Sequence, residues 1–189
     1  MSLFDHSVRS FKFDGTSLTD GRRLLREDYK NPDAIMFGFI VHDHLYYAVG
    51  GHIKKVKLET RISKIETVKT FKGYIADLKV YTDMDDNNWI FSIIDQKVME
   101  KCTIDGLHCV AVMYSNIYMY SFSFYGLHTI VCNMYLGNDH NMTMFHLNGS
   151  IVGEIRHPFG DVNDMHIHGD RLFYCNKDKI SVFDLQKED

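Results

Sequence analysis

Short runs of alternating polar and apolar residues, separated by tight polar turns, are the feature that most constrains how this chain folds. Residues 164 to 185 read DMHIHGDRLFYCNKDKISVFDL, with turns expected at Gly169-Asp170 and at residues 176 to 179. Successive side chains of an extended segment point to opposite faces, so Met165 and Ile167 share one face and the two histidines share the other. This stretch therefore predicts a three-stranded antiparallel meander.

The same pattern continues through most of the chain upstream of this meander. Residues 35 to 59 form three aromatic and β-branched runs with breaks at His42-Asp43 and Gly50-Gly51. Further strands are expected at 74–81, 89–94, 97–104, 107–114, 117–125, 127–136, 142–147 and 151–157. Only residues 18 to 30, LTDGRRLLREDYK, predict a helix, ended by Asn31-Pro32. The predicted fold class is all-β, built from antiparallel meanders.

Repeated phrases suggest which all-β fold this is. Gly106-Leu-His-Cys-Val recurs twenty residues later as Gly126-Leu-His-Thr-Ile, and the strand ISVFDL follows directly after RLFYC. This rhythm over residues 35 to 186 resembles degenerate WD40-like β-propeller repeats, with ISVFDL as the third strand of a blade, although no Trp-Asp dipeptide occurs. Since such repeats take about 40 to 50 residues per blade, the resemblance implies a small propeller-like domain of four or five blades.

Two other arrangements fit the same strands. One is a β-sandwich or barrel, and the other is an incomplete propeller that a partner subunit completes. The N-terminal strand SVRSFKFDG has no predicted neighbour, and the C-terminal meander lacks an outer strand. Pairing these two would close the ring and remove an exposed edge.

Composition and charge limit the remaining possibilities. With 189 residues, of which 45% are hydrophobic, the chain is expected to form a single domain over 1–189. The formal net charge of −4, without a basic block, argues against nucleic acid as a partner. No apolar run approaches the roughly 20 residues of a membrane helix, and the N-terminus lacks a signal peptide pattern. A cytoplasmic or otherwise intracellular location is therefore expected, without a membrane partner.

The cysteines and histidines are the candidate reactive or metal-binding groups of this chain. Cys102, Cys109, Cys132 and Cys175 have no CxxC spacing, which predicts reduced, buried thiols. His166 and His168 have the spacing of two metal ligands on one strand face, with a third ligand from His157, Asp161, Asp164 or Cys175. The favoured interpretation is that both histidines face solvent or line the opening of the ring, with no metal and no cofactor. The alternative is a metal-assisted hydrolase in which the metal activates a water.

No catalytic serine, cysteine or nucleotide-binding motif is present, which favours a non-catalytic protein–protein interaction module. We expect a subunit or adaptor of a larger intracellular assembly whose loops bind a basic surface of a protein partner. The loops 83–88, 137–141 and 157–164 supply the predicted binding residues, which are Asp83, Asp85, Asp86, Asp139, His140, His157, Asp161 and Asp164. The aromatic run Tyr118, Tyr120, Phe122 and Phe124 is predicted to share one strand face in the core.

Overall fold

The computed structural model confirms an all-β chain. It describes residues 7–13, 18–26, 37–58, 64–136, 139–155, 162–176 and 179–185, with the backbone alone for 7–13, 18–26, 136 and 139–140. These residues form seventeen β-strands, and no helix long and apolar enough to cross a membrane is found among them. The chain divides into two compact units, Met1–Tyr74 and Ile75–Asp189, which are described separately below.

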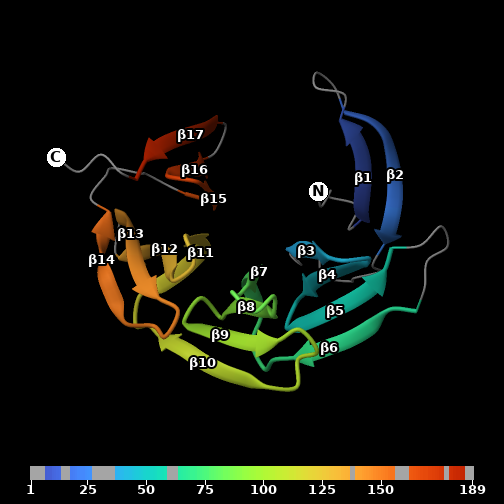
Figure 1. Cartoon of the computed structure of the whole chain (residues 1–189), viewed down its shortest axis with the longest axis horizontal. Coiled ribbons are helices and arrows are strands. Elements are labelled where there is room, and N and C mark those ends of the chain that lie inside the picture. Colours follow the sequence, from blue (N-terminus) through green and yellow to red (C-terminus); the bar gives the residue numbers. More distant parts are fainter. Residues whose placement is uncertain are drawn as a thin grey trace. The chain divides into compact units, whose positions relative to one another are not determined.

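The first unit contains a hairpin and a four-stranded meander (Figure 1). The hairpin joins β1 (Ser7–Phe13) to β2 (Leu18–Arg26). The meander runs in chain order through β3 (Gly38–Val41), β4 (His44–Val49), β5 (His52–Lys57) and β6 (Glu66–Thr70). Its first two turns lie where the sequence predicted them, at His42-Asp43 and Gly50-Gly51. Strand β6 was not predicted, since ETVKT carries a single apolar residue.

The predicted helix over residues 18–30 is wrong. Residues 18 to 26 form β2, which pairs antiparallel with β1. Gly21 weakens a helix at this position by about 1 kcal/mol, and the hydrogen bonds to β1 come from residues outside the local window. The N-terminal strand therefore has β2 as its partner. Whether β1 also pairs with the last strand depends on how the two units sit together, and this stays a prediction.

The second unit consists of three successive antiparallel sheets, each following chain order. The first contains β7 (Ile75–Thr82), β8 (Asn88–Ile94), β9 (Val98–Thr103) and β10 (Cys109–Tyr114). The second contains β11 (Tyr118–Tyr125), β12 (Thr129–Leu136), β13 (Asp139–His146) and β14 (Ile151–Ile155). The third contains β15 (Asp164–His168), β16 (Arg171–Asn176) and β17 (Lys179–Asp184), which confirms the predicted C-terminal meander and its third strand.

The first strands of these three sheets lie next to one another, β7 beside β11 and β11 beside β15. Asp77 on β7 accepts a hydrogen bond at Oδ2 from the backbone N–H of Phe122 on β11, at 3.0 Å. Ser123 on β11 repeats this arrangement, because its Oγ accepts from the N–H of Ile167 on β15 at 2.9 Å. Sheets joined through their first strands are propeller blades. The β3–β6 sheet of the first unit is a further antiparallel meander in chain order. The chain therefore has the four sheets of a small propeller-like fold, which is the lower of the two predicted blade numbers.

The middle sheet of the second unit is buried on both faces, which explains its nearly continuous apolar strands. One face meets the β7–β10 sheet through Phe91, Ile93, Met119 and Phe122, all fully buried. The other face meets the β15–β17 sheet through residues that include Val131 and Met142. These two layers form the core of the second unit.

A β-bulge changes the predicted face of β11. Met119 pairs with Met134 and Ser121 with Asn133, so Tyr120 is an extra residue on this strand. Met119 consequently joins Phe122 in one core cluster, whereas Tyr118 remains 47% exposed. The prediction that all four aromatic residues share one core face is therefore wrong for Tyr118 and for the bulged Tyr120, neither of which belongs to this cluster, although Phe122 and Phe124 follow it.

The prediction of four reduced cysteines is also wrong. Cys102 on β9 and Cys109 on β10 lie directly opposite each other and form a disulfide. Among the other two, Cys132 is a buried free thiol and Cys175 is a half-buried one. Disulfides are rare in reducing compartments, so the cysteines no longer support an intracellular location, which remains a prediction on the other grounds.

Candidate docking surface

The strand directions separate the turns of the second unit into two ends. The hydroxyl of Tyr81, near the end of β7, donates to the carbonyl of Leu127, which follows β11. The hydroxyl of Tyr125, at the end of β11, donates to Oδ1 of Asp170, which follows β15, at 3.2 Å. The three first strands therefore end on the same side of the unit. Because neighbouring strands are antiparallel, every second turn lies on this side, at 83–87, 104–108, 126–128, 147–150 and 169–170.

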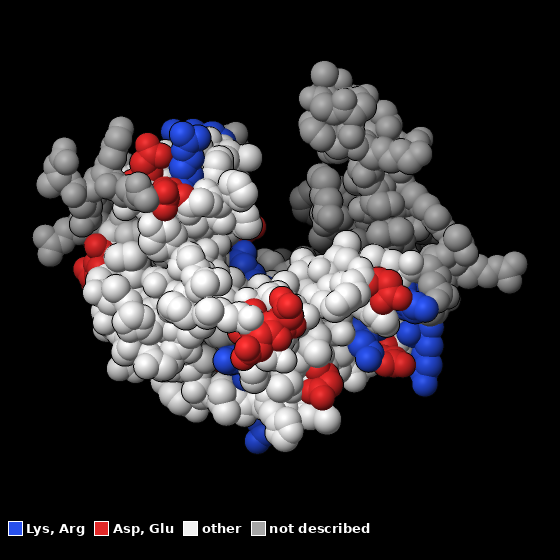
Figure 2. Space-filling model, viewed as in Figure 1, with Lys and Arg blue, Asp and Glu red and all other residues white. Residues whose placement is uncertain are grey.

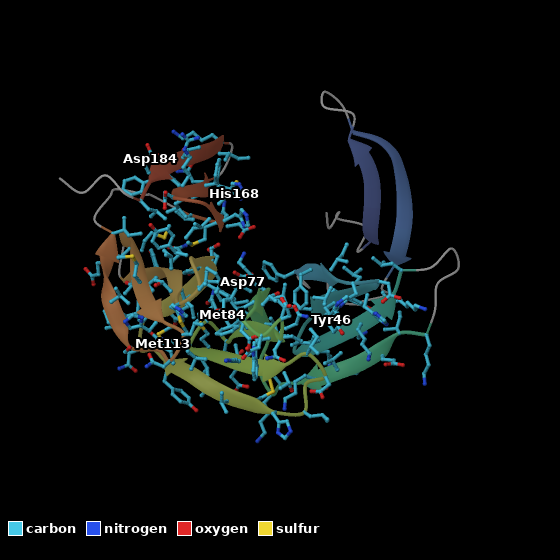
Figure 3. All side chains as sticks on the ribbon, viewed as in Figure 1. Tyr46, Asp77, Met84, Met113, His168 and Asp184 are labelled. Carbon is cyan, nitrogen blue, oxygen red and sulfur yellow. A yellow bond between two sulfur atoms is a disulfide. The ribbon has the colours of Figure 1, made fainter. Side chains whose placement is uncertain are left out.

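This side carries a group of aspartates that we call the acidic rim. Its members are Asp83, Asp85, Asp86, Asp105, Asp170 and Asp184. Among the described residues of these turns and strand ends, the only lysine or arginine is Arg171, whose Nε lies 3.4 Å from Oδ1 of Asp184. Figure 2 shows acidic atoms grouped on the viewed face near β8, and Figure 3 labels Met84 and Asp184 on that face. The rim thus has an excess of negative charge.

Asp83 organises the β7–β8 turn and is not available to a partner. Its carboxylate accepts hydrogen bonds from the backbone N–H of Asp85 at 3.0 Å and of Asn87 at 2.9 Å, and from Nε1 of Trp89 at 2.9 Å. These donors, led by the indole of Trp89, lower the pKa of Asp83 to about 2. The carboxylate therefore holds the turn in one conformation.

Replacing Asp83 by alanine should loosen this turn while leaving the sheet folded. The backbone N–H groups of Asp85 and Asn87 and Nε1 of Trp89 would then donate their hydrogen bonds to water. We expect a small drop in melting temperature and a red shift of the Trp89 fluorescence. Trp89 is the single tryptophan, so the emission spectrum reports on this position alone. Asp85→Ala is the matched control, because Asp85 is exposed in the same turn, has no positive φ, and its carboxylate makes no hydrogen bond to another described residue of the turn. Equal spectra for the two variants would contradict the organising role of Asp83.

Asp85 and Asp86 are the residues of this turn that can meet a partner. Both side chains are exposed and form no ion pair with a described residue. Met84 between Asp83 and Asp85 is 74% exposed. Two carboxylates beside an exposed thioether combine charge with an adaptable apolar contact, which suits protein binding.

An open pocket of about 450 Å³ lies between the turns that follow β11 and β15. Its lining residues are Phe124, Tyr125, Gly126, Ile167, His168, Gly169 and Asp170. Burial and the hydrogen bond to Asp170 raise the pKa of Tyr125, so its hydroxyl stays protonated at neutral pH. The pocket therefore adds an aromatic wall and a carboxylate to the acidic rim.

The structure does not bring all the predicted binding residues together. Asp83, Asp85 and Asp86 belong to the acidic rim, whereas Asp164 begins β15 on the opposite side, where Nζ of Lys79 lies 3.5 Å from its Oδ1. Asp139 and His140 begin β13 and lie on that opposite side too, described by their backbone alone. His157 and Asp161 lie outside the described residues.

Sequence reasoning missed Asp105, Asp170 and Asp184. Asp105 and Asp170 lie in turns that the sequence already showed, Asp105-Gly106 and Gly169-Asp170, and Asp184 lies at the end of the last predicted strand. Because antiparallel strands alternate in direction, counting strands would have assigned these turns to the same side as 83–88. The loops were instead chosen by their charge, regardless of that alternation.

His166 and His168 point outward from β15, while the alternate residues Met165 and Ile167 are buried, as the alternation predicted. The only group of three potential ligands among the described residues is Glu100, Cys102 and Cys109, which does not include these histidines. His168 lines the rim pocket (Figure 3). Whether the pair binds a metal stays a prediction.

The buried acid Asp77 belongs to the scaffold of the unit. Its side chain is 1% exposed and accepts from the N–H of Leu78 at 2.7 Å and of Phe122 at 3.0 Å. Burial raises the pKa of Asp77 to about 6, even though Nζ of Lys79 lies 3.5 Å from Oδ2. Burial also raises the pKa of the nearby Cys132 thiol, which keeps it protonated and unreactive.

Comparisons with known proteins identify the fold and go no further. No protein-family model matches the sequence, and no curated protein matches it. The structure is similar to that of the computationally designed Ika4 protein, with a TM-score of 0.59 and 12% identity, covering 88% of this chain and 99% of that one. It is also similar to a chain of a nidogen/laminin complex, with a TM-score of 0.65 and 9% identity, covering 96% of this chain and 87% of that one. At these identities the likeness shows a shared all-β fold.

Proposed function

We propose that this chain is a non-catalytic protein-interaction module, a subunit or adaptor of a larger assembly, which binds a basic surface of a partner protein through its acidic rim. The observation that carries this proposal is the concentration of aspartates on one side of the second unit, with Arg171 already paired to Asp184. Asp85 and Asp86 supply exposed charge there, and Met84 supplies apolar contact.

Electrostatics of this kind act mainly on the rate of association. Like charges gathered on one surface attract an oppositely charged partner over roughly 8 to 10 Å at physiological ionic strength. Such steering raises association rates by tenfold or more at low salt, and it weakens as salt is added. The negative charge of the rim would repel a nucleic acid backbone, so it supports a protein as the partner.

Other functional assignments have less support from the described residues. The metal-assisted hydrolase with His166 and His168 remains an alternative, but no contact in the described residues favours it. Kinship with WD40 repeats in particular is a hypothesis that rests on strand rhythm. One similar structure is a chain of a nidogen/laminin complex, and at 9% identity this suggests only that the fold is compatible with protein binding.

The test compares charge reversals on and off the rim in affinity capture from the native source. Asp85→Lys/Asp86→Lys should lose the partner, and the partner's association rate should fall by about tenfold at low salt. Asp85→Lys alone is matched to Glu154→Lys, since Glu154 is an exposed acid on the outer strand β14 and changes the net charge equally. The Glu154 variant should retain the partner.

Association kinetics of the recovered partner at several salt concentrations complete the test. The association rate of the wild type should fall steeply as salt is added, and that of the double rim variant should depend much less on salt concentration. Unchanged melting temperatures would show that the variants remain folded. Equal loss of binding in the Asp85 and Glu154 variants, or a salt-independent rate in the wild type, would overturn the acidic rim as the binding surface.

A further inference from the structure

Glu100, Cys102 and Cys109 form a compact group of metal-ligating side chains on the first sheet of the second unit. Their ligand atoms all lie within 4.8 Å of one another. Glu100 and Cys102 are two residues apart on β9, so they share one face of the sheet, and Cys109 lies directly opposite Cys102 on β10. The structure holds the two sulfurs as a disulfide.

The backbone keeps the two cysteines together whether or not the disulfide is formed. Their Cα atoms are 4.1 Å apart. The hairpin is closed by the backbone bonds from Thr103 N–H to the His108 carbonyl and from Gly106 N–H to the Thr103 carbonyl, at 2.9 and 2.8 Å. Asp105 strengthens the turn, because its Oδ1 accepts from the hydroxyl of Thr103 and the N–H of Leu107. Reduction therefore leaves two thiols facing each other beside a carboxylate.

We propose that the reduced pair and Glu100 bind a thiophilic divalent cation, with Zn²⁺ as the ion that fits best. Tetrahedral zinc takes thiolate sulfur at about 2.3 Å and carboxylate oxygen at about 2.0 to 2.2 Å, which places the ligand atoms roughly 3.3 to 3.8 Å apart. The three ligand atoms lie within 4.8 Å of one another, so reduction of the sulfur–sulfur bond lets the two thiolates separate to this spacing with the carboxylate already within reach. Two thiolates and one carboxylate leave a fourth position for water, and a bound cation offsets the cost of charging the buried sulfur of Cys102.

The oxidation state of the pair decides whether this site exists. A dithiol reductant breaks the sulfur–sulfur bond, supplies one electron and one proton to each cysteine, and becomes a disulfide itself. Binding of Zn²⁺ then displaces the two thiol protons. The oxidised pair has no thiolate to offer, so the same hairpin is a crosslink in an oxidising compartment and a metal site in a reducing one.

The buried hydroxyl of Ser92 is a second feature that points to a ligand beside Glu100. It lies directly across from Glu100 on the neighbouring strand β8, and cross-strand partners share a face of the sheet. Its hydroxyl is buried and has no hydrogen-bond partner in the structure. A carboxylate ligand or a metal-bound water would use such a donor.

The proposal is tested on the full chain with Co²⁺ as a spectroscopic substitute for Zn²⁺. A tertiary phosphine reduces the disulfide, taking an oxygen atom from water, and is not a thiol that competes for metal. The reduced wild type should bind one ion per chain, with sulfur-to-cobalt charge-transfer bands and tetrahedral ligand-field bands that Zn²⁺ abolishes. The oxidised protein should show neither.

Single substitutions assign the ligands. Cys109→Ser should remove most of the charge-transfer intensity, and Glu100→Gln should weaken binding by about tenfold or more. Cys175→Ser and Glu154→Gln are matched controls at a half-buried cysteine and an exposed acid outside the group, and both should bind like the wild type.

Alkylation of the wild type tests the site without any substitution, so its result does not depend on whether a variant folds. Zn²⁺ should slow modification of Cys109 and Cys102 by iodoacetamide at least tenfold, with Cys175 unaffected, as read by mass spectrometry. The proposal is overturned if the reduced wild type shows no charge-transfer band, if Cys109→Ser binds like the wild type, or if Zn²⁺ gives no protection. Any of these results would leave the pair as a structural crosslink only.

Discussion

Replacing Phe91 by alanine should lower the free energy of unfolding by about 3 to 5 kcal/mol, as large-to-small changes at fully buried aromatic positions do. Phe91 lies on β8, has no exposed surface and packs where the first two sheets of the second unit meet. Its ring makes edge contacts with Tyr81 and Phe124, at centroid distances of 6.1 and 5.2 Å. The truncation removes these contacts and leaves a cavity that the surrounding strands fill only partly.

Urea unfolding followed by Trp89 fluorescence measures this effect in the right place, since Trp89 lies two residues away on the same strand. Tyr114→Ala is the matched control, because Tyr114 belongs to the same sheet and is 78% exposed. We expect the control to change stability by no more than about 0.5 kcal/mol. A loss below about 1 kcal/mol for Phe91→Ala would mean that the two sheets do not pack as the structure shows.

The stability difference between the wild type and Asp77→Asn should depend strongly on pH. The pKa of Asp77 is raised by burial from 3.8 to about 6 in the folded protein. A raised pKa means that the folded state holds the proton more tightly, so this stabilising contribution is complete below about pH 4 and is lost as the pH rises through 6. Lys79 and Asp164 are the charged groups that face Asp77, and both variants retain them.

Between pH 7 and pH 4 the wild type should therefore gain about 2 to 3 kcal/mol relative to Asp77→Asn, from 1.36 kcal/mol for each pH unit of the shift. Asparagine retains a carbonyl to accept from the N–H of Phe122, so the link between β7 and β11 survives. The same comparison for Glu154→Gln, an exposed position, should show no such trend. A difference that stays constant would show that the carboxyl of Asp77 is solvated, and one that falls toward pH 4 would show that Lys79 lowers its pKa instead.

The pairing of Cys102 with Cys109, and with it most of the candidate metal site, could have been predicted from the sequence. The two cysteines are symmetric about the predicted Asp105-Gly106 turn, with three residues on each side of its centre separating it from either sulfur. Counting outward from that turn pairs them directly, as the structure does. The two cysteines lack the CxxC spacing of local metal and redox motifs, and pairing across a hairpin does not need that spacing.

The sequence by itself determined the all-β class, most strand positions and nearly all the turns. These features depend on neighbours within a few residues, through side-chain alternation and through glycine and aspartate at the turns. It also determined that Met165 and Ile167 face the core while His166 and His168 face outward. Each of these features depends only on residues that are close together in the sequence.

Tertiary structure alone decided which of these elements meet. The strand at 18–26 exists because β1 pairs with it, and Tyr120 became a bulge because β12 sets the register of β11. The acidic rim depends on β7, β11 and β15 running in the same direction, which the bonds of Tyr81 and Tyr125 fix. These last two bonds join residues 46 and 45 positions apart, and the free energy that selects such contacts comes from burial and hydrogen bonds that no local window contains.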